Sequence, residues 1–430
     1  MSILNKKRLF YPNSGYLEKH RFCKRQIKIS VAREVSIMLV IPCYNEPELL
    51  KTLRSLSECG ETSCAVEVLV VINSGEHDDK KVLEQNQKTF DETIEWIKNH
   101  RNKNLLFHLI QVKNLPSKHA GVGLARKIGM DEAVARFEDI SKPDGIIVCL
   151  DADCTVEKNY LTEIEKHFHQ HPKSTGCSIY FEHPIDGNNF EQKIYDGIIN
   201  YELFLRYYNR ALNYSNFPYS FHTIGSSMAV RSKVYQKQGG MNRRKAGEDF
   251  YFLHKIFPLG NFTELNSTKT IPSPRASDRV PFGTGSAIQK YLATDAQIYL
   301  TYNIQTFIDL KMFFERVIEF YSSTSHHIIV SSLAPSVKKF LAGNNFEEKL
   351  IELRQHSGSE KMFVKRFFNW FDGFMVLKFV HSARDNFYEQ IEILDAAKAL
   401  MKLNGKKFSE NISKKEMLLE FRKWENPCLS

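Results

Sequence analysis

Several features that define particular classes of protein are absent from this chain of 430 residues. No uninterrupted apolar run approaches the roughly 18 residues that a membrane-spanning helix needs. The N-terminal stretch contains no apolar core of the signal-peptide kind, and no repeat or low-complexity tract interrupts the chain. The lack of a membrane span and of a signal peptide predicts a cytoplasmic location.

Cysteine is scarce, with eight residues in the whole chain. They form no C-x-x-C pair and no Cys/His cluster at the spacing of a zinc site. Cys43, Cys149 and Cys177 lie in or beside segments with a strand pattern. We therefore expect reduced thiols in the protein core and neither a disulfide framework nor structural zinc.

Acidic residues are few near the N-terminus, although the formal net charge of the chain is only +9. Residues 1–36 hold nine Lys and Arg against Glu18 and Glu34, an excess of seven positive charges. Such an arm attracts anionic lipid or nucleic acid, or lies across a domain as a solvated leader. Because no alternation of basic and aromatic residues follows, we favour the solvated leader and expect no nucleic-acid partner. Peripheral contact with the inner face of a membrane stays an alternative.

The remaining composition is typical of a soluble globular protein, with 42% hydrophobic and 25% charged residues. Strand and helix patterns alternate along the first half, which predicts an α/β fold with a mostly parallel sheet flanked by helices. The expected strands are 35–41, 66–72, 105–110, 146–151 and 175–181. The expected helices are 47–56, a charged helix ending near 100, 121–137 and 190–212.

From about residue 286 onward the strand patterns fade and helical spacing of apolar residues dominates. We therefore divide the chain into a basic N-terminal arm (1–34), an α/β domain (35–286) and an all-helical C-terminal region (287–430). A run rich in phenylalanine, residues 367–379, is interpreted as core. An interfacial membrane face is the alternative for this run.

The most informative stretch is 145–155, where an apolar run stops at Asp151-Ala152-Asp153. A short apolar run bounded by turn signals indicates an interior strand, and ligands of open α/β sheets bind beyond the carboxyl ends of such strands. Two hard oxygen ligands at this spacing suit Mg²⁺ or Mn²⁺ with open positions for phosphates. The alternative is a turn in which Asp caps a helix beginning near Asn159.

Two other segments carry side chains suited to a nucleotide. The first strand ends in Pro42-Cys43-Tyr44-Asn45-Glu46, where an aromatic ring beside polar groups can hold a base and ribose, or simply forms a turn. Between the third and fourth strands, the segment 117–129 combines small residues with Lys118 and Arg126, which can meet phosphates near a helix N-terminus. Its Gly-x-Gly is not a dinucleotide fingerprint.

Two later segments are rich in glycine. Residues 225–249 end in Glu248 and Asp249 at a predicted helix start, which suits a mobile substrate loop that carries a base. The alternative is a helix N-terminus with acids matched to its dipole. Residues 273–285 combine Arg, Asp and Gly and are interpreted as a lid, with an interdomain linker as the alternative.

Taken in order, these stretches resemble glycosyltransferase family 2 and its relatives with the GT-A fold, a Rossmann-like sheet flanked by helices. The resemblance rests on Pro-x-Tyr-Asn-Glu, Gly-x-x-x-Ala-Arg-x-x-Gly, Asp-Ala-Asp and Gly-Glu-Asp within residues 35–285. It implies a metal-dependent hexosyltransferase that moves a sugar from a nucleotide-diphosphate sugar to an acceptor hydroxyl in polysaccharide or glycoconjugate biosynthesis. The acceptor is a saccharide, a lipid-linked compound or a small molecule.

The resemblance also implies roles for individual residues. Asp151 and Asp153 would hold Mn²⁺ or Mg²⁺, and Asp249 would be the catalytic base with Glu248 beside it. The implied donor-binding residues are Pro42, Tyr44, Glu46, Asn73, Lys118, Arg126, Asp151, Ala152 and Asp153. An Asp base supports direct displacement, so we expect inversion at the anomeric carbon.

The sequence departs from the family pattern in three places. Asn73 stands where family members often have an Asp that reads uracil, which leaves the donor base open. No histidine occurs between Lys255 and Ala287 as an extra metal ligand, so Asp278 or water would serve. The Gln/Arg-x-x-Arg-Trp signature of processive synthases is missing, so we expect transfer of one sugar at a time.

Two other classes of protein are alternatives. A sugar-phosphate nucleotidyltransferase has a similar sheet, but it normally opens with a glycine-rich loop and an Arg after the first strand. Residues 42–46 contain no glycine, which argues against this class. A non-catalytic nucleotide-sugar-binding protein is the second alternative, and the presence of Asp151, Asp153 and Asp249 argues against it.

Overall fold

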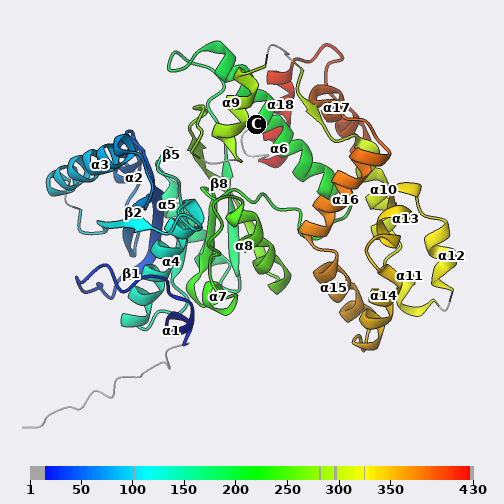
Figure 1. Cartoon of the computed structure of the whole chain (residues 1–430), viewed down its shortest axis with the longest axis horizontal. Coiled ribbons are helices and arrows are strands. Elements are labelled where there is room, and N and C mark those ends of the chain that lie inside the picture. Colours follow the sequence, from blue (N-terminus) through cyan, green and yellow to red (C-terminus); the bar gives the residue numbers. More distant parts are fainter. Residues whose placement is uncertain (1–14, 101, 280–281, 295–297, 324, 427–430) are drawn as a thin grey trace, which may run out of the picture. The chain divides into compact units, whose positions relative to one another are not determined.

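The computed structural model describes residues 15–100, 102–279, 282–294, 298–323 and 325–426. These residues divide into two compact units with different architectures (Figure 1). The first unit contains the described residues of 15–184, 223–273 and Phe282, and the second contains those of 185–222, 274–279 and 283–426. This division assigns residues 185–222 to the second unit, whereas the sequence analysis placed them in the α/β domain of residues 35–286. The domain boundaries inferred from the sequence stay a prediction.

The first unit is built on one sheet of eight strands in the order β3-β2-β1-β4-β7-β6-β8-β5. Neighbouring strands are parallel from β3 to β4 and again between β6 and β8, whereas β7 is antiparallel to both of its neighbours and β5 to β8. The predicted mostly parallel sheet is therefore confirmed. The strands are β1 (Val35–Cys43), β2 (Ala65–Gly75), β3 (Leu105–Leu115), β4 (Ile146–Cys149), β5 (Cys154–Val156), β6 (Gly176–Phe181), β7 (Met228–Arg231) and β8 (Phe262–Pro272).

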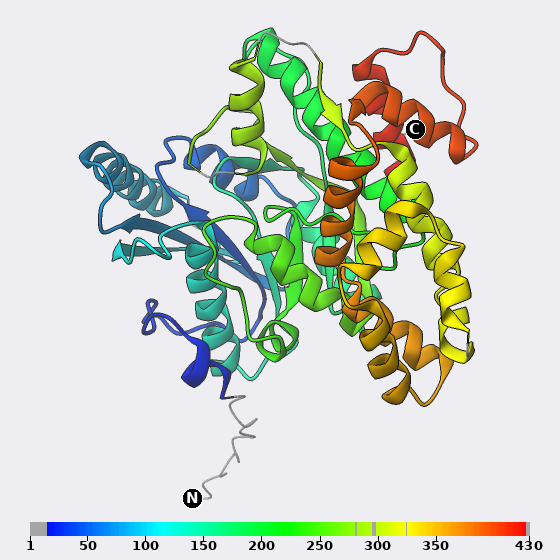
Figure 2. The ribbon, with the colours of Figure 1, turned by 45° about the vertical axis from the view of Figure 1, so that its right-hand side comes forward.

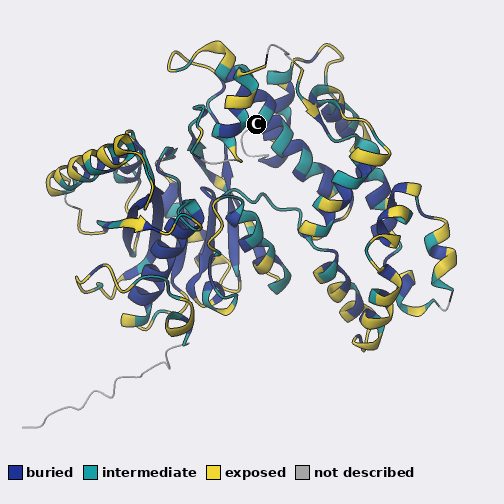
Figure 3. Cartoon of the chain, viewed as in Figure 1, coloured by how far each residue is buried: buried dark blue, intermediate teal, exposed yellow. Residues whose placement is uncertain are grey.

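Helices cover both faces of the parallel half of this sheet, which explains why β1, β2 and β4 are buried along almost their whole length (Figure 3). Apolar side chains of α2, α3 and α5 pack on one face. The helix α4 packs on the other face, so closely that a Cβ atom on Gly129 would lie 2.4 Å from Val40 Cγ1. The helices of this unit are α1 (Tyr16–His20), α2 (Leu49–Ser57), α3 (Lys80–Asn99), α4 (Val122–Asp139), α5 (Tyr160–Gln170), α7 (Ser232–Lys237), α8 (Glu248–Ile256) and the 3₁₀ turn η1 (Phe257–Leu259).

The structure differs from the sequence-based expectations for this sheet in several places. The segment read as a mobile glycine-rich loop contains β7, a fully buried strand between β4 and β6. This strand has only four residues, 228–231, and it directly follows Gly225-Ser226-Ser227. The glycine and serines made the whole segment resemble a loop in the sequence. The strand β8 was also missed, because its mixture of Asn, Ser, Thr and Lys has no clear apolar period, although it pairs with both β5 and β6. The third strand extends to Leu115 and not to residue 110.

The described part of the basic arm, residues 15–34, is largely exposed or half-exposed and lies on α4, to which specific contacts anchor it. Arg21 Nη2 donates to Glu132 Oε2 at 2.5 Å, and the backbone amides of Gln26 and Ile27 donate to the same carboxylate at 3.0 and 3.1 Å. Figure 2 shows α1 and the following segment beside α4. The acidic residues of α4 therefore neutralise part of the positive charge of the arm. Residues 1–14 lie outside the described part of the chain.

The second unit is helical, as predicted, except for one short antiparallel pair formed by β9 (Leu300–Thr301) and β10 (Ile391–Glu392). Phe367, Phe371 and Phe379 are fully buried in its core, which confirms the interpretation of the phenylalanine run as core. The helices are α6 (Gln192–Tyr214), α9 (Thr284–Leu292), α10 (Ile304–Glu315), α11 (Glu319–Ser322), α12 (His326–Ser331), α13 (Pro335–Ala342), α14 (Phe346–Gln355), α15 (Glu360–Trp370), α16 (Gly373–Asn386), α17 (Ile393–Leu403) and α18 (Lys414–Glu425).

Two further sequence-based expectations concern the cysteines and membrane segments. Cys43, Cys149 and Cys177 are buried free thiols, as expected for core cysteines. Among the residues that the structure describes, no helix combines the length and apolar character needed to cross a membrane. The expected lid, residues 273–285, includes positions 280 and 281, which lie outside the described residues, so the lid stays a prediction.

Buried charges connect α6 to α18 within the second unit. Arg422 donates two hydrogen bonds of 2.8 Å to the carboxylate of Glu202, and Arg206 pairs with both Glu202 and Glu425. His222 Nε2 lies 3.2 Å from Glu425 Oε1. Burial alone would raise the pKa of Glu425, but Arg206 and His222 lower it to about 2.

We predict that Glu425 makes the stability of the second unit sensitive to acid. Its folded pKa of about 2 lies below the ordinary value of 4.5, so its contribution is present above pH 4.5 and is lost as the pH falls towards 2. The shift corresponds to about 3 kcal/mol. Urea unfolding of wild type and Glu425→Gln should therefore show the larger acid-induced loss of stability in wild type.

Glu410→Gln is the matched control, because its carboxylate is 82% exposed. This variant should follow the wild-type dependence on pH. An equal acid-induced loss in wild type and Glu425→Gln would contradict the prediction.

Candidate functional site

The carboxyl ends of β1, β2 and β4 lie at one edge of the sheet. The chain continues from β1 to β2 on one side, whereas β4 lies on the other side of β1, so the strand order reverses at this point. Open α/β sheets bind ligands at such a reversal. Asp151 follows β4 and Tyr44 follows β1, so the fold brings these two predicted site residues to the same edge.

Arg126 on α4 links the two predicted acidic pairs. Its Nη2 donates to Asp151 Oδ1 at 2.6 Å, and its Nη1 donates to Glu248 Oε1. The Arg126 side chain is only 2% exposed, and the side chain of Asp151 is 37% exposed. Burial opposes the positive charge, but Asp151 and Glu248 raise the pKa of Arg126 above its ordinary value. The Asp-Ala-Asp turn and the start of α8 are therefore held together by a buried ion-pair network.

Two glycines give Arg126 and its helix the room that this network needs. A Cβ atom on Gly123 would lie 2.2 Å from the carbonyl oxygen of Arg244, in the segment that leads to α8. A Cβ atom on Gly225 would lie 2.8 Å from both terminal nitrogens of Arg126. The Gly-x-Gly near the start of α4 therefore serves close packing of the helix against the segment before Glu248.

Glu248 and Asp249 occupy the first turn of α8, after Gly247 in the left-handed conformation at φ 69°. Burial raises the pKa of Glu248 to about 7, with Arg126 lowering it and Asp249 raising it. Burial also raises the pKa of Asp249, against the lowering effect of Arg126 and of the amides of Phe250 and Gly225. Two carboxylates with raised pKa values at a sheet edge are suited to proton transfer near neutral pH.

The residues predicted to hold a base and ribose meet a carboxylate that the sequence analysis missed. The Tyr44 hydroxyl donates to Asp78 Oδ1 at 3.1 Å, and the Gly75 amide donates to Asp78 Oδ2 at 2.7 Å. Asp78 follows the end of β2, three residues beyond Gly75. The family resemblance directed attention to Asn73, but β2 extends to Gly75, so an acid just after the second strand is present after all.

A chain of amide contacts holds this part of the edge in place. The Asn45 amide donates to Asn86 Oδ1 at 2.8 Å, and Asn86 Nδ2 donates to the carbonyl oxygen of Asn73 at 2.9 Å. Asn45 has φ 49°, a backbone conformation that Asn tolerates better than most residues. Glu46 is fully buried, and its Oε1 accepts the Glu48 amide at 2.9 Å. A direct contact of Glu46 or Asn73 with nucleotide stays a prediction.

The other predicted donor residues occupy different environments. Pro42 lies inside β1, so it does not end this strand as the sequence suggested. The pairing between β1 and β4 stops at Val40, two residues before Pro42. The missing amide hydrogen of Pro42 therefore removes no hydrogen bond between β1 and β4. Ala152 is buried, and its carbonyl oxygen accepts the Thr52 hydroxyl at 2.8 Å. Lys118 is exposed on the turn before α4. Arg126 is engaged by two carboxylates, so its contact with phosphate stays a prediction.

Asp151 and Asp153 are the candidate ligands for a divalent cation. Within the part of the chain that the structure describes, no three or more His, Cys, Asp or Glu side chains gather as a metal-binding group. Two carboxylates at the sheet edge nevertheless fit Mg²⁺ or Mn²⁺, which commonly use one or two protein carboxylates together with substrate phosphates and water. Arg126 occupies one Asp151 oxygen. Asp278 belongs to the second unit, and its role as a further ligand stays a prediction.

Comparison with known proteins identifies the family. Residues 38–239 match the model of glycosyl transferase family 2. This part of the chain belongs to glycosyl transferase family 2. The protein is therefore a glycosyltransferase, and its sheet, flanking helices and helical C-terminal region have the GT-A-like arrangement that the resemblance implied. The match includes Tyr44, Arg126 and Asp151 but ends before Glu248 and Asp249.

The solved structures found for this transferase are distant. The structure of S. aureus TarS 1-349 in complex with UDP-GlcNAc has 13% sequence identity and a TM-score of 0.40, covering 89% of this chain and 95% of that chain. The UDP complex of the same protein has 14% identity and a TM-score of 0.39, covering 88% and 94%. Similarity this low carries no argument about this chain. No curated protein matches the sequence.

We predict that Glu248 produces the acid limb of the pH–rate profile of this transferase. A raised pKa means that Glu248 gains its proton as the pH falls through about 7, and protonation breaks its ion pair with Arg126. The value of kcat/KM in wild type should therefore decline below pH 7. Glu248→Gln cannot titrate, so its acid limb should move to lower pH, with reduced activity at pH 8.

The measurement is the pH dependence of kcat/KM for both proteins, with circular dichroism at each pH to confirm folding. Glu165→Gln is a matched control, because Glu165 is a distant acid of the same unit that accepts hydrogen bonds from Ser63. An unchanged limb near pH 7 in Glu248→Gln would assign the titration to another group.

Proposed function

We propose that this glycosyltransferase moves a single sugar from a nucleotide-diphosphate sugar to an acceptor hydroxyl, with a divalent cation and with inversion of configuration. The observation that carries the proposal is the Arg126 network, because it joins the Asp-Ala-Asp turn to the turn that bears Glu248 and Asp249. One edge of the sheet thus combines candidate groups for binding a diphosphate with a candidate base.

The donor nucleotide is proposed to bind beyond the ends of β1 and β2. The Tyr44 ring, held by Asp78, offers an aromatic surface for the base, and the polar groups of Asp78 and Asn73 offer hydrogen bonds to base and ribose. The start of α4 presents backbone amides and Lys118 to the diphosphate, which a helix N-terminus attracts. The base and the sugar of the donor are left open by this arrangement.

Asp151 and Asp153 are proposed to hold Mn²⁺ or Mg²⁺ together with the diphosphate. The cation, when bound, would neutralise negative charge on the leaving diphosphate. Arg126 would orient Asp151 by occupying one of its oxygens, which leaves the other side of the carboxylate available. Since Arg126 is itself buried, it acts in this proposal as a positioning residue and not as a phosphate ligand.

Asp249 is proposed to be the base. It would accept the proton of the acceptor hydroxyl while the acceptor oxygen forms a bond to the anomeric carbon. The bond between that carbon and the diphosphate oxygen breaks, and the nucleoside diphosphate leaves with the electron pair. Attack opposite the leaving group inverts the anomeric configuration. The raised pKa of Asp249 suits this role, because a stronger base accepts a proton more readily.

We predict that Asp153→Ala loses metal-dependent donor binding while the fold is kept. Asp153 is only partly buried at the sheet edge, so its removal leaves no large cavity. Calorimetric titration with nucleotide should show Mn²⁺-dependent binding in wild type, and at least about tenfold weaker binding in the variant, equivalent to 1.4 kcal/mol.

Asp91→Ala is the control, because Asp91 is an exposed acid on α3 and should leave binding unchanged. Thermal unfolding of the variants monitors the fold. Equal affinity in wild type and Asp153→Ala, with and without Mn²⁺, would remove the metal assignment.

We predict inversion of configuration and dependence of the chemical step on Asp249. An α-linked donor should give a β-linked product, which anomeric coupling constants measured by NMR decide. Asp249→Asn should lower kcat by about 10²-fold or more with little change in donor affinity. An α-linked product would contradict the proposed displacement, and a variant that retains kcat would exclude Asp249 as the base.

A further inference from the structure

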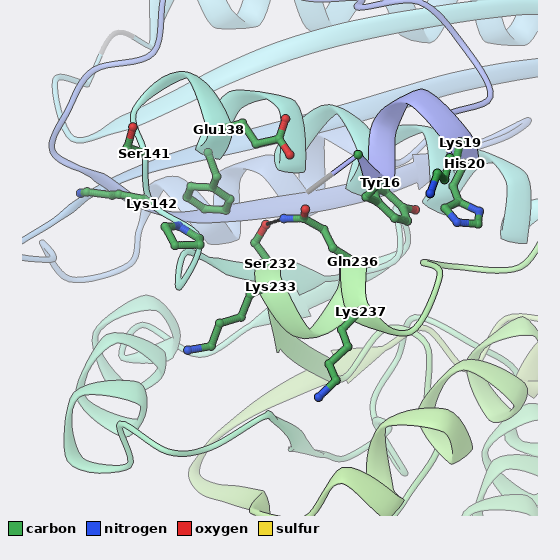
Figure 4. A pocket seen from close by; sticks show the side chains of 13 residues that line it. Tyr16, Lys19, His20, Glu138, Ser141, Lys142, Ser232, Lys233, Gln236 and Lys237 are labelled. Carbon is green, nitrogen blue, oxygen red and sulfur yellow. Dashed lines mark hydrogen bonds between the residues drawn. The ribbon is translucent and has the colours of Figure 1, made fainter. Parts of the chain in front are cut away.

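A pocket lies in the first unit, at the end of α4 that is remote from Arg126 (Figure 4). Its volume is about 350 Å³. Phe137 in its wall is eleven residues from Arg126 along α4, which corresponds to roughly 17 Å of helix. The pocket is lined by residues of α1, of the last turn of α4 and of α7, and by Ser141, Lys142 and Pro143 after α4.

The position of the pocket separates it from the proposed donor site. Lys142 in its wall donates to the carbonyl oxygen of Val35, the first residue of β1, at 2.9 Å. The donor site is proposed to lie beyond Cys43, the last residue of that strand. A nine-residue strand spans roughly 25 Å, so the pocket and the donor site lie at opposite ends of β1.

The walls of the pocket are held by contacts within the protein. The Tyr16 hydroxyl donates to Asp131 Oδ1 at 2.8 Å, and the Tyr235 hydroxyl donates to the same oxygen at 2.7 Å. A Cβ atom on Gly145 would lie 2.3 Å from the Phe137 ring, so this ring is closely packed. Gln236 Nε2 donates to Ser232 Oγ at 3.2 Å. The pocket is therefore preformed and needs little ordering to accept a ligand.

Basic side chains dominate the edge of the pocket. Figure 4 shows Lys19 and His20 on one side and Lys142 on the opposite side, whereas Lys233 and Lys237 extend from α7 towards the bottom of the view. Glu138 is the acidic residue in the lining, and Asp144 pairs with Lys233 from outside it. Lys19 and Lys237 are exposed. The floor is partly apolar, because it includes the rings of Tyr16 and Phe137 and the side chain of Pro143.

We propose that this pocket binds the phosphate group of a ligand, with Lys19 and Lys237 as its principal cationic contacts. A preformed pocket with an apolar floor and a basic edge suits a phosphate attached to an organic body. The phosphate comes from the headgroup of an anionic lipid or from a soluble phosphate ester.

The adjoining surface favours the lipid as the source. The segment that follows α1 exposes Lys24 and Lys28, and the side chain of Ile29 beside them is 69% exposed. Basic residues attract an anionic bilayer, and an exposed aliphatic side chain enters its interfacial region. A soluble ester would require only the pocket itself.

The test uses the double variant Lys19→Glu/Lys237→Glu of the full chain. Both side chains are exposed, so reversing their charge should leave the fold intact. Lys81→Glu/Lys98→Glu is the matched control, because these exposed lysines lie on α3, which packs on the other face of the sheet. The two double variants change the net charge equally. Donor hydrolysis and thermal unfolding confirm that each is folded.

Two binding arms distinguish the sources of the phosphate. The first arm measures sedimentation with vesicles of phosphatidylcholine alone or of phosphatidylcholine mixed equally with phosphatidylglycerol. The second arm titrates inorganic phosphate and glycerol 3-phosphate and monitors binding by NMR. Wild type and control should bind in at least one arm, and the Lys19→Glu/Lys237→Glu variant should bind at least about tenfold more weakly in that arm.

The outcome of each arm has a defined meaning. Binding to anionic vesicles alone supports the pocket with a lipid headgroup as ligand, and binding of glycerol 3-phosphate supports it with a soluble ester. Absence of binding by wild type in both arms, or equal binding by the two double variants, overturns the proposal. Donor hydrolysis is measured separately, so failure here is distinguishable from failure of the proposed transferase mechanism.

Discussion

The buried guanidinium of Arg126 is the constraint on which the site depends. A cation removed from water needs anionic partners, and Asp151 and Glu248 supply them from segments far apart in the sequence. This requirement fixes the Asp-Ala-Asp turn against the start of α8. It also explains the absence of side chains at Gly123 and Gly225, where a Cβ atom would occupy the space of the neighbouring segment or of the guanidinium itself.

The helix α4 extends this constraint through the first unit. It is buried on nearly all sides, so its buried charged side chains need partners of opposite charge from other segments. Glu132 is paired by the segment after α1, and Arg136 pairs with Glu67 of β2 at 2.5 Å. One helix therefore connects the sheet, the N-terminal segment and the sheet edge that carries Asp151. Its first turns lie at the proposed donor site, and its last turn forms a wall of the basic pocket.

Much of this architecture was predictable, because burial leaves a direct record in the sequence. Continuous apolar runs predicted β1, β2 and β4, which are covered on both faces, and helical spacing of phenylalanine predicted the core of the second unit. The strands β7 and β8 were not predicted. The strand β7 is too short to show an alternation of apolar and polar residues, and β8 is mostly polar. Their strand conformation is therefore set by pairing with neighbouring strands and not by a local sequence pattern.

The sequence alone determined which chemical groups are available: two acids after a buried strand, two more at a helix start, and an aromatic residue after the first strand. It determined these because strand ends and helix starts have local signatures in residue type and spacing. Only the tertiary structure decided that Arg126 joins the two acidic pairs, that Tyr44 meets Asp78, and that the basic arm lies on α4. These contacts join residues up to about 120 positions apart, and such partners are chosen by chain topology and by the need to pair buried charges, neither of which a local pattern records.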